Sequence, residues 1–391
     1  MSQSNENLRR DLSGLQMAAI AVGVIAALGA GYGWTQDKEQ FWHAYLYAFF
    51  FWLAPTTGSL GLYMLHQLTG GRWGAALRRP LEAAMRMLPL MALFFIPVIV
   101  HMASYYPWAV PGAAEHDELL AHKAGWLNPS FFIVRAALYF AVWILLAGVM
   151  QRVSARRDTG DYAAAGIARS TSGPGFLLFA LTLSFAVFDW AMSLEPHWFS
   201  TMYGAIFLVG GGLETMCMCI LFGAWLRKRA PFTQVFTSER FHDLGTLSFA
   251  MVLLWAYTNF SQYLIIWSGN LNEETPWVHL RTSESWRTLA LGLVVLHFAL
   301  PFFLLLFRKH KQHAQILAGI AGLLVCMRFL DLYWYIGPAF SPEFKMHWLD
   351  LAVPLAMGGF WIALFLRAFK SKPFVSEQDL ELSGSLQHAH H

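Results

Sequence analysis

The sequence predicts an all-α, polytopic membrane protein, and three observations support that prediction. Of the 391 residues, 57% are hydrophobic and only 13% are charged, about half of the roughly 25% that is usual in a soluble domain. The apolar residues gather into ten runs, and each is close to the about 20 residues that a helix needs to cross a bilayer. Lys and Arg fall mainly in every second connection between these runs.

The ten predicted membrane spans, in chain order, cover residues 15–33, 43–65, 83–104, 130–151, 176–193, 202–226, 243–268, 285–307, 313–335 and 347–369. No small-residue cleavage site closes the first apolar run, so we expect a retained helix and not a secretory signal. The longest connection, residues 105–129, is rich in Pro, Gly and acidic residues and is expected to form an ordered cap with a short helix. None of the connections is long enough for a soluble catalytic domain.

The distribution of Lys and Arg predicts the orientation of the chain. The N-terminus, the connections after spans two, four, six and eight, and the C-terminus hold 20 of the 27 basic residues. Only five lie on the other side: Lys38, Lys123, Arg281, Arg287 and Lys345. Both termini are therefore expected in the cytoplasm. The polar C-terminal tail, residues 373–391, ends in HAHH, and we assign that His cluster no function.

A first group of polar residues is predicted near the outer surface. Depth along the alternating spans places His101, Arg135 and Asp189 at one level, and Glu195 and His197 follow at the exit of span five. If spans three to five pack together, a cation, a carboxylate and an imidazole meet in one pocket. Such a pocket has the acid–base groups for a quinone-like or proton site. The alternative is a structural ion pair between Arg135 and Asp189.

A second group lies in the later spans and predicts a proton path. Glu214 is near the middle of span six behind three glycines, which permit close helix packing. His297 is in the middle of span eight, and Asp243 begins span seven. Arg328 and Asp331 are three residues apart on span nine, within pairing distance. Burial disfavours a charged carboxyl group, the property that a membrane proton carrier uses, although Arg328 with Asp331 fits a structural pair equally well.

The same spacing argues against bound metal and haem. Cys217, Cys219 and Cys326 form no CxxC or CxxCH motif, which disfavours covalent haem c and thiolate-bound clusters. The deep histidines, His101 and His297, lie at different depths in different halves, which disfavours haem b. We therefore expect no metal in this chain.

The rivals to a quinone or proton site are a secondary transporter and a purely structural membrane anchor. A secondary transporter would show a helix broken at mid-depth, whereas Pro97 and Pro301 predict kinks. A quinone site needs an acid–base group beside aromatic walls, and the aromatic residues of span two and of HMASYYPW (101–108) provide them near His101. A purely structural membrane anchor stays open.

Three long motifs resemble a known family. They are DWAMSLEPHWFSTMYG (189–204), ERFHDLGTLSFAMVLLWAYTNFSQYLIIWSGNLNEETPWV (239–278) and LTGGRWGAALRRPLEAA (68–84). The chain resembles the ActF family of membrane subunits from bacterial alternative complex III, within the wider family named for NrfD and the polysulfide reductase anchor. The resemblance extends over nearly the whole chain.

The resemblance implies ten helices arranged as two four-helix bundles, residues 43–193 and 202–335, with one flanking helix on each side. It implies a location in the inner membrane of a bacterium, and a non-catalytic or accessory subunit of a menaquinol-oxidising respiratory complex that passes electrons to a cytochrome or a terminal oxidase. The expected partners are the paralogue ActC, the iron–sulfur and c-haem subunits, and lipids, with no nucleic acid. Menaquinone is the possible ligand, while haem c and iron–sulfur clusters are expected only in partner subunits. The first bundle is where the paralogue holds quinol, and the second is where protons are expected to cross.

Overall fold

The computed structural model describes residues 2–161 and 163–375, and all regular elements within these ranges are helices. Ten of the described helical segments are long and apolar enough to cross a membrane. The chain is therefore an all-helical, multi-pass membrane protein, as the sequence predicted. The HAHH cluster and residues 376–391 of the predicted tail lie outside the described residues.

The membrane-crossing segments in chain order are α1 (Ser2–Gln36), α2 (Lys38–Thr69), α3 (Arg72–Met85) with α4 (Leu88–Val100), α7 (Pro129–Asp158), α8 (Ala163–Trp190), α9 (Met202–Leu226), α10 (Ser238–Gly269), α12 (Glu284–Gly292) with the π-helical segment η4 (Leu293–Ala299) and α13 (Leu300–Leu306), α15 (Ala314–Ile336) and α16 (Leu349–Lys370). Short helices in the connections are η1 (Met102–Ser104), η2 (Pro107–Ala109), α5 (Ala113–His116), α6 (Glu118–Lys123), η3 (Met192–Leu194), α11 (Thr275–Arg281), α14 (Arg308–Gln312) and η5 (Gly337–Ala339). The predicted cap at 105–129 is thus ordered and helical in part.

Local sequence explains where several helices begin and end. The Asp37 side chain accepts a hydrogen bond from the backbone N–H of Gln40 at 3.0 Å and caps α2. Asn128 caps α7 in the same way, at 2.9 Å from the N–H of Phe131, and Pro129 occupies the first helical position. Asn270 ends α10 in the left-handed conformation, with φ of 46°.

The third span differs from its prediction. The sequence placed it at 83–104, but the helix starts at Arg72. A turn at Arg86 and Met87 interrupts it and separates α3 from α4. The charged residues of α3 lower its hydropathy, so this part of the span was not predicted. Arg78 and Arg79 are buried, and each forms an ion pair with Glu82, at 3.1 and 3.0 Å.

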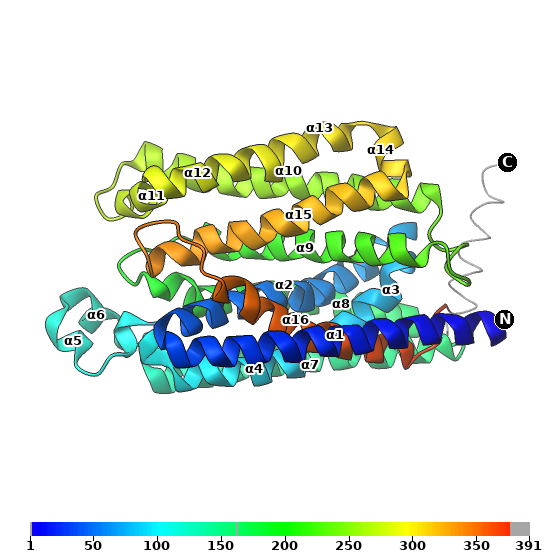
Figure 1. The fold of residues 1–391 in the computed structure, drawn as a ribbon, viewed down its shortest axis with the longest axis horizontal. Helices are drawn as coiled ribbons and strands as arrows, with labels where there is room; N and C mark the ends of the chain where they lie inside the picture. Colours follow the sequence, from blue (N-terminus) through cyan, green and yellow to red (C-terminus); the bar gives the residue numbers. More distant parts are fainter. Residues whose placement is uncertain (1, 162, 376–391) are drawn as a thin grey trace.

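The helices end at two opposite ends of the molecule, and most Lys and Arg residues were predicted at one of them. Lys370 at the end of α16 donates to Ser13 near the start of α1 at 2.8 Å, so the first and last described helices meet at one end. We call this end, where α1 begins and α16 ends, the basic end. Figure 1 shows α5 and α6 at the opposite end, which we call the loop end.

Helix α2 occupies the interior of the molecule. It packs against α16, α8, α9, α3 and α4. Helix α9 contacts α2, α8, α10 and α15, while α7 packs on α8 and α4. Figure 1 shows α1 running along the outside of this assembly, and its principal partner is α16. The two central helices, α2 and α9, therefore join the earlier spans to the later ones.

The orientation leads to a first testable prediction. A reporter that is active only in the cytoplasm should be active when fused after Lys372, which lies at the basic end. The same reporter inserted into the 105–129 loop should be silent, because the positive-inside rule places the loop end outside. Activity in the loop fusion and silence in the terminal fusion would contradict the ten-span topology.

Candidate functional site

A buried ion pair joins Arg135 of α7 to Asp189 of α8. Nε of Arg135 lies 2.7 Å from Oδ2 of Asp189, and Nη2 lies 2.9 Å from Oδ1. Both side chains are at most 5% exposed. The pairing that the sequence predicted is therefore present, and its two-bond geometry is that of a strong, oriented ion pair.

Two more donors complete the surroundings of the Asp189 carboxylate. The Tyr139 hydroxyl donates to Oδ2 at 2.8 Å, and the Trp126 indole N–H donates to Oδ1 at 2.9 Å. The Arg135 guanidinium also lies 4.2 Å from the centre of the Trp126 ring. An ionised carboxylate offers about four acceptor positions, and the described residues fill them. This geometry favours the structural interpretation of the pair.

The structure does not bring His101 to this ion pair. His101 ends α4, and its imidazole stacks on Trp42 of α2 with ring centroids 3.8 Å apart. Both line a separate cavity of about 470 Å³ between α1, α2, α4 and α16, which also includes Tyr45. The depth of a residue along a helix does not fix the face from which its side chain leaves. The predicted aromatic walls beside His101 are nevertheless present.

Glu195 and His197 also lie apart from Asp189. After α8 the chain turns through η3, and the Glu195 carboxylate pairs with Arg281 of α11 at 2.5 and 3.2 Å. The exposed His197 imidazole lies 2.7 Å from Asp117, which caps α6. The backbone N–H of Leu120 donates to Asp117 and, with His197, holds the pKa of that carboxyl below its usual range. Glu195 and His197 therefore connect the segment after α8 to other connections at the loop end, through Arg281 and Asp117.

Arg281 is a site residue that the sequence argument missed. It is fully buried, lies 3.8 Å from the centre of the Trp277 ring and donates to the backbone oxygen of Tyr335 at 2.8 Å. In the sequence it counted only as a loop charge. The one available signal was its position four residues after Trp277, which places both on one face of a short helix.

The later spans form a buried cluster of ionisable groups. Arg328 of α15 forms an ion pair with Asp331, and its Nε lies 3.9 Å from Oε2 of Glu214 on α9. The Trp255 indole of α10 donates to Asp331 at 3.0 Å, and its ring lies 4.0 Å from that of His297. Glu214, Arg328, Asp331 and His297 are each at most 2% exposed. The structure thus brings together four of the five residues of the predicted proton path.

Several polar atoms of this cluster have no hydrogen-bond partner among the described residues. They are both carboxylate oxygens of Glu214, both ring nitrogens of His297, Nε of Arg328 and Oδ1 of Asp331. Buried polar atoms are normally satisfied, and those without protein partners commonly bind water. His297 lies in the π-helical segment η4, a local irregularity that is frequent at functional sites.

Asp243 is the predicted proton-path residue that lies elsewhere. It is in the second turn of α10, and Oδ1 lies 3.9 Å from Nδ1 of His242. Twelve residues separate it from Trp255, about 18 Å along a helix. Asp243 therefore lies near the basic end, away from the buried cluster.

The three glycines of α9 allow close contact with three different helices. A Cβ at Gly210 would lie 2.6 Å from the guanidinium of Arg328, and one at Gly211 would lie 3.5 Å from the backbone oxygen of Ala54 on α2. At Gly212 the nearest atom is the flexible methyl group of Met251, at 3.8 Å. The predicted close packing is present, and Gly210 gives Arg328 its space.

This packing predicts unequal effects of two alanine substitutions. Gly210→Ala should destabilise the protein by about 1–3 kcal/mol, because the added methyl group displaces a guanidinium held by Asp331. Gly212→Ala on the same helix should be nearly neutral and serves as the control. Thermal unfolding of the detergent-solubilised variants measures both, and equal melting temperatures would contradict the tight fit at Gly210.

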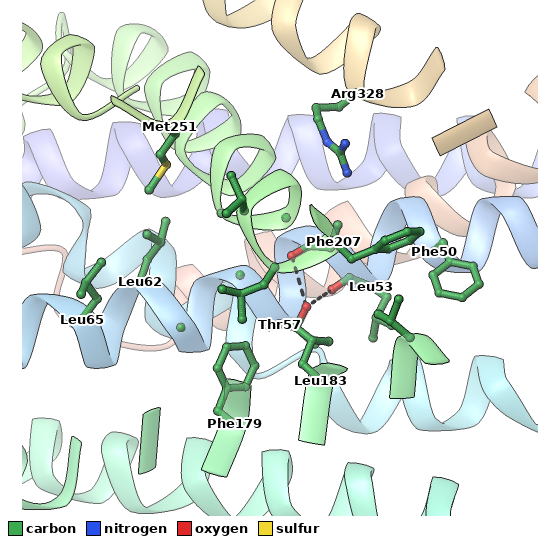
Figure 2. Close-up of a pocket in the computed structure, with 18 of the residues that line it drawn as sticks. Phe50, Leu53, Thr57, Leu62, Leu65, Phe179, Leu183, Phe207, Met251 and Arg328 are labelled. Carbon is green, nitrogen blue, oxygen red and sulfur yellow. Dashed lines mark hydrogen bonds between the residues drawn. The ribbon is translucent and has the colours of Figure 1, made fainter. Parts of the chain in front are cut away.

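Two further cavities lie near the cluster. One, of about 170 Å³, has apolar walls from α2, α8, α9 and α10, and Arg328 is its charged residue. Figure 2 shows Arg328 reaching toward this cavity from α15, opposite Thr57 and Leu183. The other, of about 300 Å³, is polar and lies at the loop end, with Tyr47, His43 and Asp350 in its walls.

Tyr47 connects the polar cavity to the helix that bears Arg328. Its hydroxyl donates to the backbone oxygen of Phe329, the residue next to Arg328, and its ring centre lies 4.7 Å from that of Phe329. At the other side of the cavity, Asp350 accepts a hydrogen bond from Gln40 at 2.8 Å. The sequence argument missed this cavity, because its walls come from α2, α15 and α16, which are distant in the chain.

No cluster of three or more His, Cys, Asp or Glu with the geometry of a metal site occurs in the part of the chain that the structure describes. Comparison with known proteins adds no identification, since neither a scan against protein-family models nor a search of curated proteins finds a match.

Proposed function

We propose that the chain is an ActF-type membrane subunit of a quinol-oxidising respiratory complex of the alternative complex III kind. Two four-helix bundles form its body: α2, α3 with α4, α7 and α8 in the first, and α9, α10, α12 to α13 and α15 in the second. The packing of α7 on α8 and of α15 on α9 supports this grouping. The proposal places the chain in a bacterial inner membrane, with its termini in the cytoplasm and ActC, iron–sulfur and c-haem subunits as partners.

The observation that carries the proposal is the buried cluster of Glu214, Arg328, Asp331 and His297. Charged groups at this depth cost roughly 2.5–3.5 kcal/mol each on insertion scales, and a purely structural pair would leave few atoms unsatisfied. Glu214 makes no direct hydrogen bond within the described chain, and its nearest cation, Arg328, is 3.9 Å away. In the proposed function Glu214 takes up and releases protons, and Tyr47 and the polar cavity provide their route to the loop end.

A quinone-like pocket is the second part of the proposal, and the cavity beside His101 suits it best. Trp42 and Tyr45 provide flat aromatic walls, and the His101 imidazole is a hydrogen-bonding group for a quinol oxygen. Menaquinol, when bound, supplies two electrons and two protons. The residues of this chain would hold the ring against Trp42 and accept one proton at His101, and the second proton would pass to water at the loop end. The electrons would leave through the iron–sulfur and c-haem partners.

A structural anchor is the rival function, and one observation favours it. The Arg135–Asp189 pair is fully satisfied by the described residues, as expected of an element that holds helices together. Under this reading the second cluster also serves only stability. The two functions predict different outcomes for a change at Glu214.

Purification from the native membrane tests the assignment to a complex. We expect the chain to copurify with c-haem and iron–sulfur subunits and with menaquinol-oxidising activity. The chain purified alone should show no Soret band and no stoichiometric iron, because its Cys and His spacing provides no ligand set. Isolation as a free monomer that moves a solute across vesicles would refute the proposal in favour of a secondary transporter.

A further inference from the structure

Two arginines at the basic end line one small cavity. Arg79 belongs to α3, Arg240 lies in the first turn of α10, and their side chains are only 6% and 7% exposed. The cavity has a volume of about 20 Å³, enough for one or two atoms of the size of a water oxygen. Its other walls are apolar: Ala75, Ala76, Phe232, Val235, Phe374 and Val375.

Each arginine has a buried N–H group without an acceptor among the described residues. Arg79 donates from Nη1 to Glu82 at 3.0 Å and from Nη2 to Asp158 at 2.9 Å, but its Nε has no partner. Nη1 of Arg240 also has none, and the described residues provide no ion pair to its guanidinium.

Glu239 and Asp243, the acidic side chains beside Arg240 on α10, act on its charge, but neither forms an ion pair with it. Glu239 pairs with Arg72 at 3.7 Å, and Asp243 faces His242 at 3.9 Å. Arg240 is therefore a buried cation without a partner carboxylate in the described chain.

Three electrostatic effects favour an anion in this cavity. A buried charge without a counter-ion is strongly unfavourable. Two like charges on one cavity also repel each other. The positive end of the α10 dipole, where Arg240 lies, adds to the same potential. Guanidinium N–H groups bind phosphate and carboxylate oxygens with directional, charge-assisted hydrogen bonds.

We propose that this cavity binds a phosphate-class anion, with one charged oxygen held between Nε of Arg79 and Nη1 of Arg240. The volume admits one or two oxygen-sized atoms, so the rest of the anion lies at the mouth of the cavity. Free inorganic phosphate and a phospholipid headgroup both have this chemistry. The site is separate from the proposed quinone and proton sites and does not depend on them.

Thermal unfolding of the full chain in detergent tests the site. At constant ionic strength, the melting temperature of the wild type should rise with inorganic phosphate and then saturate. Arg240→Met should increase the half-saturating concentration by on the order of tenfold or more, the effect of losing one charge-assisted hydrogen bond. Arg240→Lys keeps the charge without the guanidinium geometry, and its half-saturating concentration should also rise.

Arg308→Met is the matched control, because Arg308 of α14 is exposed at the same end (Figure 1) and lies outside the cavity. Its phosphate response should equal that of the wild type. An equal response in Arg240→Met, or an equal effect of chloride in the wild type, would overturn the proposal.

Native mass spectrometry separates the two sources of the anion. A phospholipid that is retained by the wild type and lost in Arg240→Met identifies a headgroup. A saturable phosphate response without retained lipid identifies a free anion. A response that appears only after removal of residues 376–391 means that the chain's own carboxylates, such as Glu377, fill the site, and this overturns the proposal. Absence of both response and lipid also overturns it, in favour of a bound water.

Discussion

Asp189→Asn should prevent normal accumulation of the protein in the membrane. The asparagine keeps the shape of the side chain but removes its charge, so the Arg135 guanidinium remains buried without a counter-ion. Breaking a buried ion pair in this way costs roughly 3–5 kcal/mol, a large part of the 5–15 kcal/mol by which native proteins are stable. We therefore expect low yield and a lowered melting temperature, measured on membranes and on detergent extracts.

Two comparison variants make this result specific. Arg135→Gln combined with Asp189→Asn removes both charges and should be more stable than Asp189→Asn alone, because no unpaired ion remains. Asp117→Asn removes a carboxylate from the solvent-accessible pair with His197 and should accumulate normally. Normal assembly of Asp189→Asn with quinol oxidation reduced 10²–10⁴-fold would instead identify Asp189 as a proton-transfer group.

The sequence allowed the fold to be predicted because its two strongest signals are physical requirements of a bilayer. Apolar length and the side of the basic residues are independent of each other, and together they defined all ten spans. Three helices, α1, α3 and α8, begin well before their predicted spans. In α3 the reason is that its arginines are buried by pairing with Glu82 and Asp158. Hydropathy treats a charge as solvated, so it has no means to recognise a charge that is satisfied inside the protein.

The candidate sites were predictable only in part. Two ion pairs could be predicted, because a charge inside a span needs a partner and an opposite charge lay at the same depth. They are Arg135 with Asp189 and Arg328 with Asp331. His101 had the same depth as Asp189, but its side chain leaves α4 on the face toward Trp42. The angular position of a helix in a bundle depends on packing between distant segments. This angular position could not be predicted from a single sequence.

Arg281 and the polar cavity at Asp350 illustrate the same limit. Both depend on contacts across large sequence separations: Arg281 with Glu195, and Asp350 with Gln40. Charged residues in short connections are usually solvated, and Arg281 counted only as one of these, while Asp350 was not singled out in the tenth span. Only the three-dimensional structure shows that these connections fold back over the ends of the helices.

Glu214→Gln should leave assembly intact and reduce the coupled reaction. Unlike Asp189, Glu214 is the more distant of two carboxylates around its cation, since Arg328 keeps its closer ion pair with Asp331 and lies 3.9 Å from Glu214. Glutamine has the same shape and no exchangeable carboxyl proton. If Glu214 carries protons, quinol oxidation or the proton movement coupled to it should fall about 10²–10⁴-fold, the contribution of a positioned acid–base group.

The measurement needs the assembled complex, reconstituted in vesicles with a pH-sensitive dye and with menaquinol as the substrate. Asp243→Asn is the matched control, because Asp243 is a carboxylate of α10 that lies outside the buried cluster. It should retain both turnover and proton movement. A fully assembled Glu214→Gln complex with unchanged turnover and unchanged proton movement would refute the proton-path role and leave the cluster a structural one. Loss of assembly in Glu214→Gln would show that the carboxylate, although 3.9 Å from Arg328, is needed to offset the buried guanidinium.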